Sequence, residues 1–349
     1  MILVDPLIGQ GPALVRQLTL LYPTIINRAR VAWGVIFHAS DTAAGFAAVT
    51  TVFGRQLERR LADDVRRTDP DLVVSVHPLL NHVAARAIDA SARPRGLVTV
   101  VTDLVDVHRG WICNQAELIV VPTEQARANA LQRGANPDRV RLLGLPVDLS
   151  FRPAAPGEKA ALRRRFGLDE DRATILMAGG GEGSGRLLPR VRQMTSKRHP
   201  WQLITVCGRN QRLQAKLAEM PAATPNLVLG FVDNMPELMR ASDLLVTKAG
   251  PGSTAEAMAS ELPLLLTGFL PGQEASNVDF VVSSGLGVYA PQVEDLEIQV
   301  KQLLGSGRGA LRRMERRMAE LSRPYAALDI ARQCLARAQP YMASGQTER

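Results

Sequence analysis

The chain has 349 residues, of which 46% are hydrophobic and 22% charged, a composition that argues against a disordered chain and a length that indicates two domains. Aromatic residues make up only 4%, which argues against a protein that binds nucleic acid by stacking its bases. The formal net charge of +8 indicates either an anionic partner or an arginine-rich surface that meets only solvent.

The cysteines and the apolar runs argue against several classes of protein. Cys113, Cys207 and Cys334 lie far apart without a Cys-x-x-Cys pair, so neither a disulfide framework nor a metal site is predicted, and a reducing cytosol fits. No apolar run approaches the roughly 18 residues of a membrane-spanning helix. The first residues also lack the pattern of a signal peptide, so none is predicted.

The stretch 11–38 has two interpretations. It mixes Leu, Ile, Trp33 and Phe37 with Arg16, Arg28 and Arg30, which is the composition of an interfacial helix pair on an anionic bilayer. It also fits two amphipathic helices that cover a sheet, and composition alone favours this second interpretation.

Strand and helix patterns then alternate along the first half. Short β-branched runs that end in turn residues predict buried strands at 71–76, 97–101 and 118–121. Helices are predicted at 83–89 and 124–133, and Gly134 stands where a helix C-cap glycine belongs. Prolines 146, 153 and 156 then indicate a linker between domains.

The second half repeats the alternation. Strands are predicted at 173–177, 202–206, 227–229, 244–247, 262–266 and 287–289, and the tail 308–337 is predicted helical throughout. Alternating strands and helices predict an α/β fold with parallel sheets, whose ligands bind beyond the carboxyl ends of the strands. We expect an N-terminal domain at 1–148, a C-terminal domain at 149–324 and a last helical segment at 325–349.

A glycine cluster at 178–185 follows one of these strands. Gly180, Gly181, Glu182 and Gly183 open a helix, where glycine lets backbone N–H groups approach a phosphate. The register fits neither a dinucleotide fingerprint nor a Walker A loop, because Arg186 stands where the Walker lysine belongs. The alternative is a tight turn without a ligand.

A second glycine cluster, at 247–257, also joins a strand to a helix. Gly250, Gly252 and Ser253 can present N–H groups to a diphosphate, and Glu256, about one turn into the helix, can accept both hydroxyls of a ribose. The alternative is that Glu256 only complements the helix N-terminus.

A third polar loop follows at 271–277. Gln273, Glu274 and Asn277 combine donors and acceptors that suit the hydroxyls of a sugar. Glu274 at a helix start is equally consistent with ordinary capping.

His77 and Asp103 follow two successive strands of the first half. Side chains in this position can take a proton from an alcohol, so we regard both as candidate catalytic residues. A lone histidine at a strand end is more often structural.

The motifs together resemble those of the monogalactosyldiacylglycerol synthase family and the related processive diacylglycerol glucosyltransferases. The resemblance covers nearly the whole chain. It rests on SVHPL at 75–79, VTDL at 101–104, GLPV at 144–147, MAGGGEG at 177–183, CGRN at 207–210, TKAGPG at 247–252 and PGQE at 271–274.

The resemblance implies a B-type glycosyltransferase fold of two Rossmann-like domains facing a cleft. It implies an inverting transferase that needs no metal or cofactor and moves a hexose from UDP-galactose or UDP-glucose to membrane diacylglycerol, making a glycolipid. It places the lipid acceptor on the first domain and the UDP-sugar on the second, with Gly208, Arg209, Asn210 and Lys248 at the donor site. The last helix returns to the first domain, and the protein is peripheral on the cytoplasmic face of an anionic membrane.

One departure from the family pattern concerns the acceptor side. The family's first strand and its Gly-rich loop ending in histidine have no counterpart, and residues 2–5 resemble its second strand. Either the start of the chain is missing or the acceptor site is altered. In the second case, the alternatives are a UDP-sugar-binding homologue with no or altered transferase activity, or a transferase acting on another lipid-linked acceptor.

Overall fold

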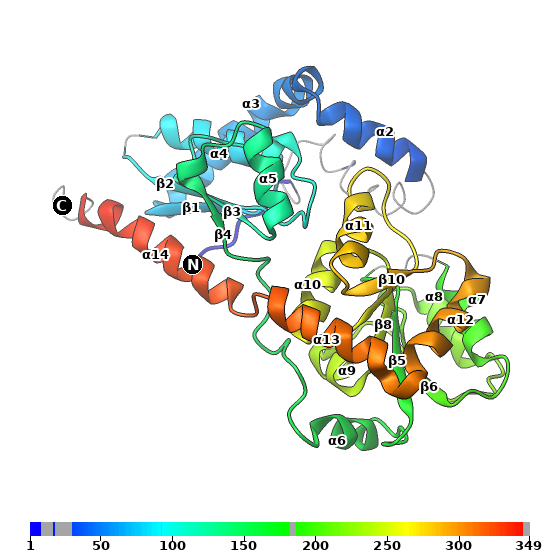
Figure 1. Ribbon diagram of the computed structural model, residues 1–349. Coiled ribbons are helices and arrows are strands. Elements are labelled where there is room, and N and C mark those ends of the chain that lie inside the picture. The colour runs from blue at the N-terminus through cyan, green and yellow to red at the C-terminus, as the bar shows by residue number, and fades with distance from the viewer. Residues whose placement is uncertain (8–16, 18–29, 92, 182–185, 345–349) are drawn as a thin grey trace. The chain divides into compact units, whose positions relative to one another are not determined.

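The computed structural model describes residues 1–7, 17, 30–91, 93–181 and 186–344 (Figure 1). The chain divides into two compact units. Unit 1 comprises Met1–Pro146, Pro271–Gln273 and Tyr325–Arg349, and unit 2 comprises Val147–Leu270 and Glu274–Pro324. The main change of unit falls at the predicted proline-rich linker.

Unit 1 is built on a parallel sheet in the order β1-β2-β3-β4. Its strands are β1 (Leu72–Ser75), β2 (Gly96–Val100), β3 (Leu118–Val121) and β4 (Val140–Leu142). The strands are short runs of branched apolar residues, and every residue of β2 and β3 is buried, as expected for a parallel sheet covered on both faces.

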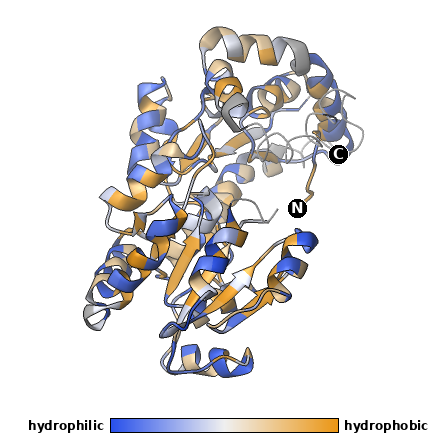
Figure 2. Cartoon of the chain, turned by 90° about the vertical axis from the view of Figure 1, so that its right-hand side faces the viewer, coloured by the Kyte–Doolittle hydropathy of each residue, from blue (hydrophilic) through white to orange (hydrophobic). Residues whose placement is uncertain are grey.

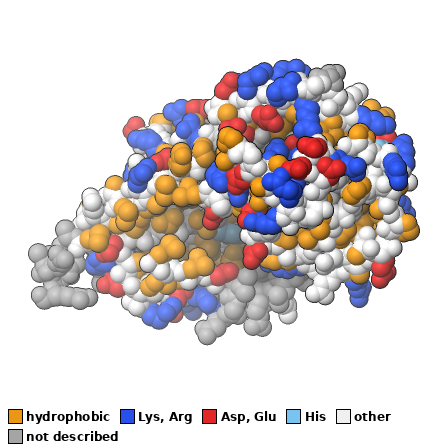
Figure 3. All heavy atoms as spheres, turned by 90° about the horizontal axis from the view of Figure 1, so that it is seen from below, with side chains coloured by type: hydrophobic (Ala, Val, Ile, Leu, Met, Phe, Trp, Pro, Cys, Tyr) orange, Lys and Arg blue, Asp and Glu red, His pale blue; other side chains and the backbone are white. Residues whose placement is uncertain are grey.

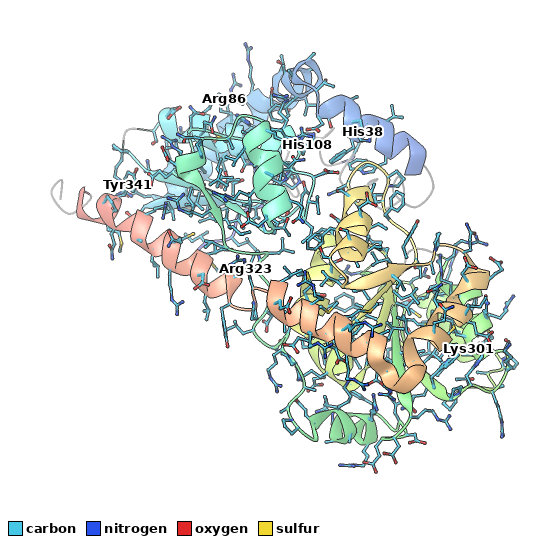
Figure 4. All side chains as sticks on the ribbon, in the orientation of Figure 1. His38, Arg86, His108, Lys301, Arg323 and Tyr341 are labelled. Atoms are coloured by element: carbon cyan, nitrogen blue, oxygen red, sulfur yellow. The ribbon has the colours of Figure 1, made fainter. Side chains whose placement is uncertain are left out.

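The helices of unit 1 are α2 (Arg30–Ser40), α3 (Ala43–Thr68), α4 (Asn81–Asp89), α5 (Glu124–Gln132) and α14 (Ala326–Ser344), with short 3-10 turns η1 (Arg109–Trp111) and η2 (Pro137–Arg139). Helices α4, α5 and α14 pack on the strands, whereas α3 packs on α4 and α2 on α3. Ile330 of α14 packs on Val98, Val100, Leu118 and Val120. Tyr341, near the end of α14 (Figure 4), donates a hydrogen bond to Glu117, which ties the helix to the start of β3.

Unit 2 contains a six-stranded parallel sheet in the order β10-β9-β8-β5-β6-β7. Its strands are β5 (Ala173–Ala178), β6 (Trp201–Val206), β7 (Asn226–Leu229), β8 (Leu244–Thr247), β9 (Leu264–Leu266) and β10 (Gly287–Tyr289). The chain runs outward from β5 to β7, then returns to β8 on the other side of β5. Ligands bind at such a reversal in α/β sheets, so a binding site is expected at the loops after β5 and β8.

The helices of unit 2 are α6 (Glu158–Arg165), α7 (Leu187–Thr195), α8 (Gln211–Ala218), α9 (Met235–Ala241), α10 (Pro251–Ala259), α11 (Ala275–Ser283), α12 (Val293–Leu304) and α13 (Gly309–Leu321), with the 3-10 turn η3 (Ser306–Arg308). Figure 2 shows the hydrophobic strands lying between helices of mixed hydropathy. The core of the unit includes Ile175, Leu203, Leu244 and Leu265 from four neighbouring strands.

Most of the predicted elements are confirmed, with shifts of one or two residues at their ends. Gly134 has a φ of +88° after α5, as a helix C-cap glycine requires. The strand β4 was not predicted, because Arg141 interrupts its short apolar run.

Two predictions about local structure are wrong. The tail 308–337 is not one helix, because α13 ends at Leu321 and α14 begins at Ala326. Pro324 lacks a backbone donor and disfavours a helical residue before it, which explains the break. Residues 2–5 form no strand, and Ile2 and Leu3 are exposed.

Candidate nucleotide-sugar site in unit 2

A pocket of about 220 Å³ opens at the carboxyl ends of β5 and β6 in unit 2. It is lined by Ala178, Gly180, Gly181, Val206, Gly208, Phe231, Val232, Met235, Met239, Leu245, Ser253 and Glu256. Five residues predicted from the sequence thus meet in one cavity: Gly180, Gly181, Gly208, Ser253 and Glu256. The mixture of an apolar wall, backbone and one carboxylate is typical of a small-molecule site.

Two glycine turns form one side of this pocket. Gly180 and Gly208 have φ angles of +72° and +57°, a region that side chains rarely adopt. Arg209 N donates to Gly181 O at 2.9 Å, which joins the two turns. A Cβ on Gly208 would lie 2.4 Å from Gly181 O, so the close approach of the two turns requires glycine at this position.

Glu256 is the carboxylate of the pocket. It lies in α10, whose N-terminus follows β8 directly through Gly250. Burial raises the pKa of Glu256 above its ordinary value. A half-buried carboxylate of this kind gains from hydrogen-bond donors brought by a ligand, since these stabilise its ionised form.

Lys248 and Glu274 form an ion pair beside the glycine turns. Glu274 is only 4% exposed, and its Oε2 accepts a second hydrogen bond, from Leu270 N at 2.7 Å. Asn277 is also buried and donates from Nδ2 to Ala249 O at 2.9 Å. Glu274 and Asn277 therefore hold the segment that follows β8, and their predicted contact with a sugar remains a prediction.

The other predicted donor-site residues are placed as follows. Asn210 caps α8 by accepting from Leu213 N at 3.0 Å, while Gly252 is exposed within the first turn of α10. Gln273 belongs to unit 1. Glu182 and Gly183 lie outside the described residues.

The apolar wall of the pocket was not predicted from the sequence. Phe231 and Val232 follow β7, and Met235 and Met239 belong to α9. The guanidinium of Arg209 stacks on the Phe231 ring, 4.6 Å from its centroid. The signal that could have found this wall is an aromatic residue directly after a predicted strand, at the same edge of the sheet as the glycine turns.

In unit 1, Asp103 is a buried carboxylate with hydrogen bonds to both oxygens. Trp111 Nε1 donates to Oδ2 at 2.6 Å, and Gln273 Nε2 donates to Oδ1 at 3.3 Å. Burial raises the pKa of Asp103, and these two hydrogen bonds oppose the rise. Asp103 therefore holds the indole of Trp111 in place. Its role as a catalytic base remains a prediction.

His77 and His108 also lie beyond strand ends in unit 1, and burial lowers the pKa of both. Leu79 N donates to His77 Nδ1 at 3.3 Å. Gly110 N donates to His108 Nδ1 at 3.0 Å, so the neutral ring of His108 carries its proton on Nε2, 3.3 Å from Ser40 Oγ (Figure 4). His108 thus caps η1, the turn that carries Trp111.

Within the described ranges, no group of three or more His, Cys, Asp and Glu side chains is arranged to hold a metal ion. The helices of the described part include none that is both long and apolar enough to cross a membrane.

Solved structures show the fold. The chain resembles HepE of Anabaena in complex with UDP-glucose, with a TM-score of 0.56 and 14% identity over 82% of this chain and 84% of that chain. It also resembles MurG of Acinetobacter baumannii, with a TM-score of 0.58 and 16% identity over 81% and 80% of the two chains. The predicted fold is confirmed: two parallel-sheet α/β domains of the B-type glycosyltransferase kind.

Sequence comparisons give the family. A sequence model of monogalactosyldiacylglycerol (MGDG) synthase matches residues 5–147, and one of the glycosyltransferase family 28 C-terminal domain matches residues 174–323. Monogalactosyldiacylglycerol synthase 1 of Arabidopsis thaliana is 34% identical over 84% of this chain, and the chain spans only 55% of that protein's length. Probable monogalactosyldiacylglycerol synthase 2 of Oryza sativa subsp. japonica is 32% identical over 89% of this chain and 68% of its own length. The chain therefore belongs to the monogalactosyldiacylglycerol synthase family.

Proposed function

We propose that this protein transfers a galactosyl group from UDP-galactose to diacylglycerol with inversion at the anomeric carbon. The pocket of unit 2, with Glu256 in its wall, is the observation that carries the proposal. The names of the plant relatives support galactose over glucose and diacylglycerol over another lipid-linked acceptor.

The donor binds across the carboxyl end of the sheet of unit 2. Glu256 accepts the two ribose hydroxyls, and the apolar wall around Val232 and Met235 receives the base. The diphosphate meets the glycine turns and the N-terminus of α10, whose free N–H groups and dipole favour an anion. These groups, together with Lys248 and Arg209, stabilise the charge that develops on departing UDP.

The acceptor binds at unit 1, where Asp103 or His77 takes the proton from the attacking hydroxyl. His77 fits a base at neutral pH because its lowered pKa keeps the ring neutral. Asp103 fits a base because its raised pKa makes the carboxylate a better proton acceptor than an exposed aspartate.

An assay with defined substrates tests the activity. Purified protein is incubated with vesicles that contain diacylglycerol and with either UDP-galactose or UDP-glucose, and lipid products are identified by mass spectrometry. Monogalactosyldiacylglycerol with a β-linkage, determined by nuclear magnetic resonance, is the expected product. UDP binding without lipid product would instead support a nucleotide-sugar-binding homologue.

Titration calorimetry with UDP, ADP, GDP and NAD tests the nucleotide. UDP is expected to bind most tightly. Stronger binding of ADP or NAD would contradict the proposed donor.

We further propose that the protein docks peripherally on an anionic bilayer, on its cytoplasmic face. In α2, Val35 and Ile36 are 65% and 54% exposed, while Trp33 and Phe37 are partly buried. Figure 3, seen from the side of the molecule away from α2, shows basic and acidic side chains interspersed on that face. The exposed apolar residues of α2 are the observation that supports docking.

Vesicle sedimentation with matched variants tests this docking. Val35→Ser with Ile36→Ser is expected to reduce association with phosphatidylglycerol vesicles, and added salt to reduce it further. Ile298→Ser is the matched control, because Ile298 is also 54% exposed but lies in α12 of unit 2. Equal association of all variants with neutral and anionic vesicles would contradict the docking proposal.

A further inference from the structure

Lys248 reaches across the space between the two glycine-rich loops of unit 2. A Cβ on Gly180 would lie 3.8 Å from Lys248 Cε, and a Cβ on Gly250 would lie 3.2 Å from Lys248 Nζ. The lysine side chain therefore runs from the end of β8 past the loop that follows β5. This is the place where the proposed function puts the diphosphate.

Glu274 holds this lysine from a buried position. Its Oε1 is paired with Lys248 Nζ, and its Oε2 accepts from Leu270 N at 2.7 Å. The Glu274 side chain is 5% exposed, whereas that of Lys248 is 33% exposed. The Glu274 carboxylate is thus fixed in position, and the more exposed ammonium of Lys248 is the group of this pair that a ligand can reach.

The ion pair of Lys248 and Glu274 affects the net charge beside the two glycine-rich loops. Arg209 also contributes a cation there, since a Cβ on Gly181 would lie 3.5 Å from its Nη1. Glu274 offsets the charge of Lys248, and a diphosphate bound beside the lysine is repelled by the carboxylate. At the intermediate dielectric near a protein surface, a unit charge a few Å away changes binding measurably.

We propose that Glu274 is a positioning residue that holds Lys248 between the glycine loops and offsets its charge, so that product UDP dissociates readily. The inference rests on the proposed function, because it needs UDP to bind in this pocket. This role is distinct from a contact between Glu274 and the transferred sugar. UDP lacks that sugar, so a change in UDP affinity cannot come from such a contact.

UDP and uridine titrations on the Glu274→Gln variant test this role. The glutamine keeps an oxygen for Leu270 N but removes the charge that offsets Lys248. UDP is expected to bind about 5- to 20-fold more tightly to the variant than to the parent, while uridine, which lacks phosphate, binds both equally. Product inhibition by UDP in the transferase assay is expected to strengthen by a similar factor.

Two further variants make the result specific. In a Lys248→Met background, Glu274→Gln is expected to produce a smaller gain in UDP affinity, because the repulsion by the carboxylate is removed but no lysine is released toward the diphosphate. Glu297→Gln is the matched control, since Glu297 pairs with Lys197 and Lys301 and does not line the pocket. It is expected to leave UDP affinity unchanged.

The outcomes separate this inference from the proposed function. Failure of the parent protein to bind UDP overturns both. A parent that binds UDP, with a folded Glu274→Gln variant of equal or weaker UDP affinity, overturns the role of Glu274 alone. If the Glu274→Gln variant does not fold, the Lys248→Met variant provides the test. UDP binding by that variant as tight as by the parent would overturn the role of Glu274, because that role acts through Lys248.

Discussion

Polar groups at the strand ends are arranged differently in the two units. In unit 2, the pocket keeps open space beside the backbone of Gly180 and Gly208, and Glu256 faces that space with a raised pKa. In unit 1, Asp103 is buried with a hydrogen bond on each oxygen, and His108 is held by Gly110 and Ser40. Unit 2 thus leaves hydrogen-bonding capacity for a ligand, whereas the polar residues of unit 1 largely fix one another.

The two units are expected to respond differently to mutation. Changes that fill the open space of unit 2 should remove binding with little loss of fold. Changes in the hydrogen-bonded cluster of unit 1 should leave nucleotide binding intact and act on the transfer step.

The largest effect is expected for Gly208→Ala. The new Cβ would lie 2.4 Å from Gly181 O and 2.7 Å from Gly180 O, at a φ of +57°. The two turns must separate, so UDP affinity is expected to fall by at least about 100-fold, measured by titration calorimetry.

Gly167→Ala is the control for backbone strain alone. Gly167 has a φ of +69°, but a Cβ there would meet nothing within 4 Å. We expect a loss of about 1 kcal/mol of stability and unchanged UDP binding. If both variants bind UDP like the parent, the phosphate-binding role of the glycine turns is wrong.

Asp103→Asn is expected to act on transfer alone. The amide cannot take a proton, so kcat should fall about 100- to 10,000-fold, while UDP affinity in unit 2 stays within about twofold. The measurements are the lipid transfer assay and calorimetry.

Trp111→Phe distinguishes catalysis from positioning at Asp103. It removes the indole donor that Asp103 holds but leaves the carboxylate. An equal loss of kcat in the two variants would show that Asp103 acts only by placing Trp111.

Glu256→Gln is expected to weaken binding while stabilising the free protein. Loss of the charged acceptor of two hydroxyl bonds should reduce UDP affinity by about 2–4 kcal/mol. Because the folded-state pKa of Glu256 is raised, the unfolded chain loses its proton first, so this residue lowers stability as pH rises above 4.5. A neutral glutamine avoids this cost, and the melting temperature at pH 7 should rise. Unchanged UDP affinity would refute the ribose contact.

The sequence predicted the parts of the molecule that depend on local pattern. Buried strands such as 118–121 and the glycine turns at 180 and 208 have strong composition signals, and both were found where expected. The apolar wall of Phe231 and Met235 was missed, because its residues come together only through the packing of α9 beside the sheet. The pairing of Glu274 with Lys248 was missed for the same reason, since 26 residues separate them.

The smallest expected effect concerns pH and the histidines. Burial lowers the pKa of His77, His82 and His108 in unit 1 and of His199 in unit 2. The unfolded chain therefore binds protons first on acidification, so their contribution is fully present above pH 6.5 and declines as pH falls below it. Since three of these histidines lie in unit 1, this unit should lose more stability than unit 2.

Hydrogen exchange measured peptide by peptide at pH 7.5 and 5.5 resolves the two units. After correction for intrinsic rates, peptides of β1 to β3 are expected to lose protection by about 3- to 10-fold more than those of β5, β6 and β8. His108→Gln should reduce this difference, because the amide does not titrate, whereas His199→Gln should not. Equal loss of protection in both units would contradict the role of the histidines, and a difference that is undiminished in the His108→Gln variant would show that His108 does not contribute to it.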